Sequence, residues 1–470
     1  MRALLAVTVL GLAPVLAAQQ VNVASPAAER LRVTTTSEEA SRHFFAGVSE
    51  ARHFFTSKAT MHFDRAIAGD PNLGLARVFR AAWEPGPTQS ERAANIDRAV
   101  ATMNGATTNE LVIALALREF TNNTRAHELW ETAVKLMPGD PNVAFYAALT
   151  KPAPGNVAAM RAVTERFPDD APAFNILAYQ LWQQGDHEGG FKAVRRYVEL
   201  APDHPNSHDS YAELLQWSGR LTEAQAHYAR AAQLDSTFSE AYMGIAEVLQ
   251  LSGRGADARR QIQLAIAHSP SKANTVAYTR DLARSFLMDG MAKDGMDQFA
   301  NALRDAQALN RPALIAQIHR DMAFADAQSG RGTAIASHLA AASAGGADDP
   351  MQIEMTAAAH AVGGDISVAR QATQKLTTLA QPDNQFATHV AALNAIISLR
   401  ENKPKEALSQ LAGAPLDDAW VRTLTAECYA ATGNLTDARA LKNQVLTDPQ
   451  LNFDDGYNIS ARIRAAKIKA

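Results

Sequence analysis

The sequence predicts an all-α protein: a solenoid, or α-α superhelix, of about twelve antiparallel helix pairs. One observation is a recurrence at 34 residues, since Gly185, Gly219 and Gly253 are evenly spaced. A second is that small residues return at fixed offsets, as Ala224 and Ala258 do five residues after the last two glycines. A third is that 470 residues, 47% of them hydrophobic and 20% charged, exceed one ordinary compact core yet have a globular composition. A repeated unit of this length predicts an array in which each helix pair packs against its neighbours.

The first element is a predicted signal peptide at residues 1–18. Arg2 precedes an apolar run that ends in small residues suited to signal peptidase. The run is shorter than the roughly 20 apolar residues that span a bilayer, so cleavage and export to the periplasm or the medium are expected. The only cysteine is Cys428, so no lipidation cysteine follows the cleavage region. Residues 19–36 are expected to form a mobile linker.

The repeats are predicted over residues 37–447. Alanines at the shared offsets allow the two helices of a pair to approach closely, and Gly219 ends the first helix in a conformation that other residues adopt at a cost. Proline at the offset of Pro202 and Pro270 stops the second helix. At one turn Asn402 stands where the other repeats have glycine. The segments 73–105 and 141–169 predict shorter, atypical pairs.

Residues 448–470 form the last predicted element, a C-terminal capping segment. Its final stretch reads DDGYNISARIRAAKIKA and predicts a basic helix. A helix of this kind could cover the open end of a helix-pair array, which otherwise exposes apolar surface.

The repeated unit resembles the tetratricopeptide repeat. The shared features are the 34-residue length, a large–x2–large–small pattern before the turn glycine, and Ala–x3–aromatic–x2–Ala after it, as in Ala224, Tyr228 and Ala231. Together with the predicted signal peptide, the chain resembles an exported bacterial protein of this family. The resemblance covers almost all of the sequence that follows the signal.

In that family, positions 2, 5, 9 and 12 of the first helix line a concave groove. By this register the resemblance implies a partner-binding groove that runs from aromatic through acidic to basic side chains. The predicted groove residues are Asn175, Tyr179, Trp182, Asp209, Glu213, Gln216, Met243, Glu247, Gln250, Arg280, Arg284, Arg320 and Phe324. A groove that carries both signs of charge favours a peptide or protein segment that also carries both.

The sequence contains partial motifs for other kinds of site, but none of them is complete. The SGRG sequences at 252–255 and 329–332 lack the lysine of a phosphate-binding loop and fall on predicted turns. His204 and His208 could form a metal or acid–base cluster with nearby aspartates, but their places in the repeat favour packed histidines. No catalytic residue, cofactor site or metal site is therefore predicted. The net charge of −4 argues against nucleic-acid binding.

The function expected from these observations is a non-catalytic scaffold or assembly factor of the cell envelope that binds a protein or peptide in its groove. No further segment is long and apolar enough for membrane insertion after signal cleavage. Two alternatives stay open at this point. One is an enzyme, such as a hydrolase or a polysaccharide-processing protein, with its site between repeats. The other is a purely structural envelope component. The partner and the oligomeric state remain undetermined by the sequence.

Overall fold

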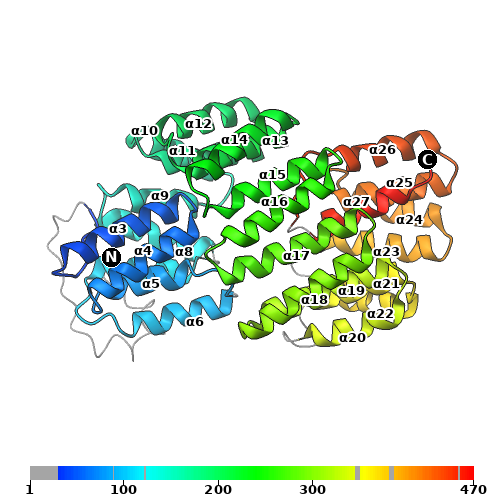
Figure 1. The fold of residues 1–470 in the computed structure, drawn as a ribbon, viewed down its shortest axis with the longest axis horizontal. Coiled ribbons are helices and arrows are strands. Elements are labelled where there is room, and N and C mark those ends of the chain that lie inside the picture. The colour runs from blue at the N-terminus through cyan, green and yellow to red at the C-terminus, as the bar shows by residue number, and fades with distance from the viewer. Residues whose placement is uncertain (1–29, 88, 121–122, 344–349, 381–385, 454–455) are drawn as a thin grey trace. The chain divides into compact units, whose positions relative to one another are not determined.

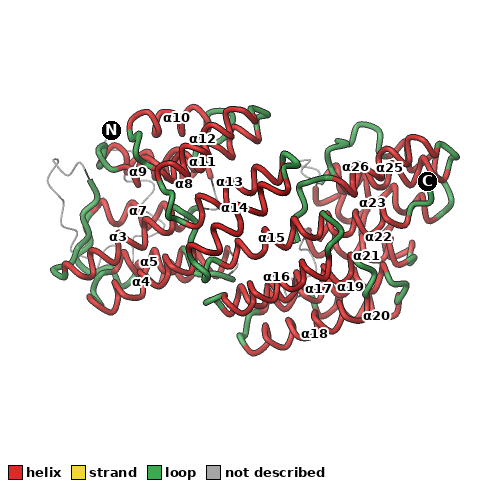
Figure 2. Tube along the Cα trace, turned by 45° about the horizontal axis from the view of Figure 1, so that its top comes forward, coloured by secondary structure: helices red, strands yellow, loops and turns green. Residues whose placement is uncertain are grey.

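The computed structural model describes residues 30–470 except 88, 121–122, 344–349, 381–385 and 454–455. The predicted signal peptide at 1–18 and the start of the expected linker, residues 19–29, lie outside the described residues. The described part is all-α and contains 25 helices (Figures 1 and 2). By its internal contacts the chain divides into two compact units. Unit 1 comprises residues 1–214 and 233–238, and unit 2 comprises residues 215–232 and 239–470.

The helices of unit 1 are short, and consecutive helices pack as pairs, α3 with α4 through α11 with α12. α13 begins in unit 1 and crosses the division. Their bounds are α3 Glu38–Arg52, α4 Thr56–Gly69, α5 Gly74–Ala82, α6 Gln89–Val100, α7 Thr108–Arg118, α8 Asn123–Leu136, α9 Pro141–Leu149, α10 Asn156–Arg166, α11 Ala171–Gln183, α12 His187–Leu200 and α13 Pro205–Trp217.

Unit 2 continues the same pattern, with α15 against α16 through α25 against α26. α14 lies almost entirely in this unit, and α27 follows the last pair. The bounds are α14 Leu221–Leu234, α15 Ser239–Leu251, α16 Gly255–His268, α17 Lys272–Met288, α18 Ala292–Ala308, α19 Pro312–Gln328, α20 Gly332–Ala341, α21 Pro350–Gly363, α22 Ile366–Ala380, α23 Ala387–Arg400, α24 Pro404–Gln410, α25 Ala419–Ala431, α26 Leu435–Thr447 and α27 Gly456–Lys467.

The order α3 to α26 makes twelve successive helix pairs, as the sequence predicted. The two segments expected to be atypical do contain short helices: α5 and α9 have only nine residues each. Helix starts follow local chemistry. Thr107 and Glu110 form a reciprocal capping box at α7, and Pro141 occupies the first turn of α9, where a missing N–H costs nothing.

The turn positions adopt the left-handed backbone that the recurrence predicted. Gly219 and Gly253 have φ of 78° and 73°, and Asn402, which replaces glycine, has φ of 59°. Asparagine tolerates this region better than most residues because its short polar side chain can bond locally. The recurring glycines are thus turn residues.

Close approach of helices explains the small residues. Ala224 and Ala258 are fully buried. Gly244 on α15 is tighter still, since a Cβ placed there would lie 2.3 Å from Cε1 of Tyr228 on α14. The Tyr228 ring therefore requires a residue without a side chain at position 244.

The described end of the predicted linker packs against unit 1. Leu31 is buried and its N–H donates to Asp140 Oδ2 at 2.8 Å, which ties the segment to the start of α9. Thr34 donates from its N–H and its hydroxyl to Glu110 at 2.8 and 2.6 Å. Residues 31–34 are therefore fixed to the helices, a difference from the expected mobile linker. The physical reason is that the carboxylates of Glu110 and Asp140, which cap α7 and α9, can each accept further hydrogen bonds.

The predicted capping segment contains α27, which contacts α25 and α26 of the last pair and also α17, four pairs earlier along the chain. Figure 1 shows α27, in red, running inward beside these helices. Its buried residues include Ile459 and Ala461. The segment thus packs against α17 as well as against the last pair of unit 2.

Candidate functional site

The predicted groove residues of unit 1 lie on α11 and α13 and interact with one another. The Tyr179 hydroxyl donates to the Glu213 carboxylate, one repeat length later in the chain. Burial, in the first place, raises the pKa of Glu213, and the hydrogen bond from Tyr179 only partly offsets this. Asn175 is 1% exposed, and Trp182 is buried with its ring stacked on His187. Burial, in the first place, and then Glu213 raise the pKa of Tyr179, and Asp209 adds a smaller electrostatic contribution in the same direction.

Predicted groove residues of unit 2 also form hydrogen bonds within the protein. Gln216 is fully buried; its Oε1 accepts from the Tyr228 hydroxyl at 3.1 Å and its Nε2 donates to Glu247 at 3.2 Å. Gln250 accepts a hydrogen bond from the Ser285 hydroxyl at 2.8 Å and donates one to the Asp289 carboxylate, at the end of α17, at 3.0 Å. Met243 is 9% exposed. Gln216 and Gln250 therefore link adjacent helix pairs.

Arg280 and Arg284 form the basic end of the predicted groove, but they are not exposed charges. Their side chains are 2% and 5% exposed, and both guanidinium groups bind Asp321 on α19 at 2.9 Å. Arg284 also binds Asp281 at 3.3 Å. Burial by itself would raise the pKa of Asp321, but the two guanidinium groups outweigh it and hold that pKa below its usual value. The sequence could not show this pairing, because Asp321 lies on the next helix pair.

An open cavity of about 440 Å³ adjoins this cluster within unit 2. Three predicted groove residues line it, namely Arg284, Arg320 and Phe324. Most of the remaining wall is apolar and comes from α17, α18, α19, α21 and α27. It includes Leu287, Phe299, Met351, Met355, Ile459 and Ile463.

The cavity is lined by side chains of both charge signs. Arg284 and Arg320 lie in its wall together with Asp321 and Glu354, and the His389 imidazole binds Glu354. The hydrogen bond to Glu354 raises the pKa of His389. The cavity thus offers an apolar surface with hydrogen-bond donors and acceptors in its wall, an arrangement that suits an apolar group with polar neighbours.

Sequence reasoning missed the cavity residues on α21 and α23, although the signal was present. Met351 and Glu354 precede the turn residue Gly364 by 13 and 10 residues, as Gln317 and Arg320 precede Gly330. His389 likewise precedes Asn402 by 13 residues. Extending the register two repeats further would have found all three. The wall residues on α27 follow no such register, because α27 lies outside the repeats.

The histidines considered earlier lie in unit 1 and are packed. His204 stacks on the His53 ring at 4.1 Å and its Nε2 lies 3.1 Å from Glu50 Oε2. His208 Nε2 bonds the Pro202 carbonyl. Among the residues that the structure describes, no three or more His, Cys, Asp or Glu side chains are grouped so that they could hold a metal ion. No described helix is both long and apolar enough to cross a bilayer.

Comparison with known proteins gives one sequence match and several structural ones. Residues 157–205 match the family model described as tetratricopeptide repeat. No curated protein sequence matches the chain.

Solved structures with a similar helical arrangement include human IFIT1, seen as a dimer with m7Gppp-AAAA. It is 14% identical over 86% of this chain and 96% of that one, with a TM-score of 0.43. PilF of Pseudomonas aeruginosa is 15% identical over 45% of this chain and 93% of its own, with a TM-score of 0.32. A thermophilic tetratricopeptide-repeat protein of Thermus thermophilus is 20% identical over 36% of this chain and 97% of its own, with a TM-score of 0.32. The family match therefore identifies residues 157–205, from α10 to the first residue of α13, as tetratricopeptide-repeat sequence within a chain of consecutive helix pairs.

Proposed function

We propose that the chain is a non-catalytic scaffold that binds a protein partner through unit 2, and that it acts after export in the cell envelope. Tetratricopeptide repeats generally mediate protein–protein interactions. The observation that carries the proposal is the cavity of about 440 Å³, lined by the predicted groove residues Arg284, Arg320 and Phe324. Its size is within the range of about 300–1,000 Å³ that is common for binding pockets.

The partner group that fits this cavity is an apolar side chain presented by a polypeptide. Phe299, Met351 and Met355 give a wall of aromatic and flexible thioether groups, which can adapt to different apolar shapes. Arg320, Glu354 and Gln328 also line the cavity, so a polypeptide backbone beside the bound side chain meets both donors and acceptors.

Export is the part of the proposal that depends on residues 1–18. An apolar run with Arg2 before it and small residues after it supports cleavage. Mass spectrometry of the protein purified from its native cells should find a mature N-terminus near Ala18 or Gln19. A chain that starts at Met1 would contradict export.

The binding test is affinity capture from an envelope extract with full-length protein and with the double variant Arg320→Glu/Met351→Asp. Met351 is 56% exposed and Arg320 is partly exposed, so both can change without removing a buried group. Charge reversal at Arg280 or Arg284 is unsuitable because both are buried. We expect the double variant to retain at most about one tenth of the specific partner, since loss of a central apolar contact costs more than about 1.4 kcal/mol.

The matched control is Leu264→Asp on α16, which also places a carboxylate at an exposed apolar position of unit 2, where the leucine is 39% exposed. It should capture the same partner as the unmodified protein. Circular dichroism should show equal helix content in all three proteins. Equal capture by the double variant and the control would mean that the cavity does not bind the partner.

A further inference from the structure

The chain leaves α26 at Asp448 and runs as an irregular segment, Asp448–Phe453, before α27 begins. Three helix-borne residues of unit 2 hold the backbone of this segment. Gln216 Nε2 lies 3.3 Å from two of its carbonyl oxygens. Arg284 Nη1 donates to the Phe453 carbonyl at 2.6 Å, and Glu247 accepts from the Phe453 N–H at 3.4 Å. All three were predicted groove residues, so the predicted groove of unit 2 already contains a peptide segment of this chain.

The side chains of the segment alternate. Leu451 is 1% exposed and Phe453 is fully buried. Gln450, before Leu451, and Asn452, between the two buried residues, are exposed. This period of two is that of an extended chain lying on a surface. The groove thus recognises two apolar side chains spaced two residues apart together with backbone groups, and neither feature is specific to this chain.

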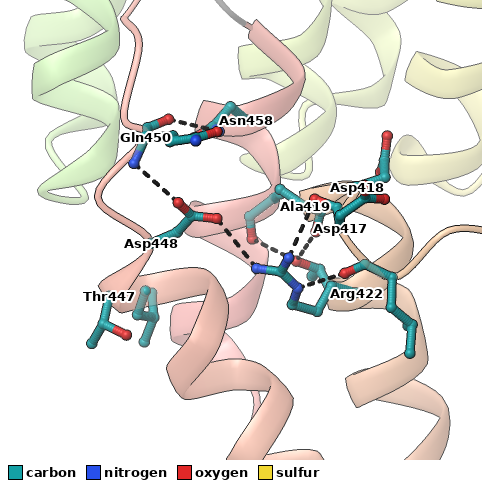
Figure 3. A network of polar contacts seen from close by, with 12 residues as sticks. Asp417, Asp418, Ala419, Arg422, Thr447, Asp448, Gln450 and Asn458 are labelled. Atoms are coloured by element: carbon teal, nitrogen blue, oxygen red, sulfur yellow. Dashed lines mark hydrogen bonds and ion pairs between the residues drawn. The ribbon is translucent and has the colours of Figure 1, made fainter. Parts of the chain in front are cut away.

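The entry of the segment is held from outside the groove (Figure 3). Arg422 on α25 binds Asp448 Oδ2 at 3.2 Å, and Asp448 Oδ1 accepts from the Gln450 N–H at 3.0 Å. Asn458 on α27 donates to the Gln450 carbonyl at 3.4 Å. These bonds turn the chain at Asp448 toward the groove, and they are independent of Gln216 and the other groove residues.

We propose that Asp448–Phe453 is an intramolecular ligand that occupies the unit 2 groove, and that a partner binds there by replacing it with its own extended segment carrying apolar side chains two residues apart. The identity of the site as a partner site rests on the proposed function. The replacement follows from the contacts, because any such extended segment presents the same carbonyls, N–H and apolar side chains to Gln216, Glu247 and Arg284. The tethered segment has an effective concentration on the order of millimolar, so the free groove is hidden from weak ligands.

The test uses a fluorescein-labelled peptide with the sequence of residues 446–453, measured by fluorescence anisotropy against full-length proteins. The double variant Leu451→Ser/Phe453→Ser removes both apolar anchors of the tethered segment but keeps the chain intact. It should bind the peptide at least about tenfold more tightly than the unmodified protein does. Adding Gln216→Met to the double variant should reverse most of that gain, because the two carbonyl contacts are lost.

A control peptide with serine at the positions of Leu451 and Phe453 should not bind the double variant. Equal binding of both peptides, or no gain over the unmodified protein when circular dichroism shows a folded variant, would overturn the proposal. A second measurement needs no variant: amide hydrogen exchange at residues 450–453 of the unmodified protein should speed up with millimolar peptide. If the double variant does not fold, the exchange measurement decides. An exchange rate at residues 450–453 that does not change with added peptide would then overturn the proposal.

The two proposals fail separately. In one case the variant Leu451→Ser/Phe453→Ser binds the peptide no better than the unmodified protein does, while Arg320→Glu/Met351→Asp still reduces partner capture. That result would refute the intramolecular ligand and keep the cavity as the partner site. The reverse result would keep the intramolecular ligand and refute the cavity as the partner site.

Discussion

Side chains at equivalent repeat positions have different bonding partners in the two units. In unit 1 Tyr179 and Glu213, one repeat apart, bond directly to each other, so the groove positions of neighbouring pairs satisfy one another. In unit 2 Gln216 and Glu247 also contact each other, but both then bind the segment Asp448–Phe453. The comparison shows that the same register produces a direct side-chain bond between neighbouring pairs in unit 1, and in unit 2 a side-chain contact whose members also bind a non-repeating segment.

Both units contain a buried ion pair, since in unit 1 Arg52 binds Asp170 with side chains only 7% and 6% exposed, but their other buried polar groups differ. Unit 1 has an uncharged imidazole, His53, which bonds Tyr197 at 2.7 Å and stacks on His204. Unit 2 has two arginines that share Asp321. An ionic cluster is far more sensitive to loss of one member than a neutral network is, because an uncompensated buried charge remains. Loss of Asp321, which compensates two buried arginines, should therefore cost more stability than loss of the neutral His53.

The largest expected effect is that of Asp321→Asn in unit 2. It removes the carboxylate that two buried guanidinium groups share, and should lower the free energy of unfolding by about 3–5 kcal/mol. Because the pKa of Asp321 is held below its usual value, the unmodified protein keeps this stabilisation above its unfolded pKa near 4 and loses it only as the pH falls through the folded value. Urea unfolding measures the difference. The control Asp64→Asn, in the exposed Arg80–Asp64 pair, should change stability by about 0–1 kcal/mol; a similar loss in both variants would contradict the role of burial.

The next effect concerns His53→Gln in unit 1 and appears in acid. Burial, followed by His204 and Arg52, lowers the pKa of His53 to about 2. The unfolded chain therefore takes up a proton near pH 6.5 that the folded chain refuses, so stability is full above that pH and falls below it. The slope is about 1.4 kcal/mol for each pH unit. His53→Gln should remove this slope in urea unfolding between pH 7 and 4. His62→Gln should remove less, because His62 is more exposed and its pKa is lowered by less; an unchanged slope in His53→Gln would show that the imidazole protonates in the folded state.

The smallest effect is expected for Tyr179→Phe, which tests the lateral network of unit 1. Loss of the hydroxyl leaves the buried Glu213 carboxylate with one donor fewer, at a cost of about 1–2 kcal/mol near pH 7. Since burial raises the pKa of Glu213, its ionised form is the costly one in the folded state, and the penalty should shrink as the pH falls through the folded pKa. Thermal unfolding at pH 7 and pH 5 measures this. Tyr242→Phe on α15, at a partly exposed tyrosine, is the control, and a penalty independent of pH would argue against ionised Glu213.

Much of the fold could be read from the sequence because its constraints are local. The turn conformation of Gly219 and of Asn402, the alanines at close helix contacts and the shortness of α9 each depend on residues within one repeat length. The candidate cavity was partly predictable for the same reason. Arg320 and Phe324, which the register assigned to a predicted groove, line the cavity, and the register counted from Gly364 also reaches Met351.

The remaining features depend on residues that are distant in sequence and follow no period. Arg284 reaches Phe453, 169 positions later, and Leu31 reaches Asp140, 109 positions later. The sequence by itself determined the helix pairs, their turns and the slots that face inward, since a repeat of 34 residues must bury the same small and large side chains in every copy. Only the tertiary structure decided which slots are paired internally and which hold the segment Asp448–Phe453. Those outcomes depend on where non-repeating chain packs, and hydrophobic burial and backbone hydrogen bonding leave no periodic trace of that in the sequence.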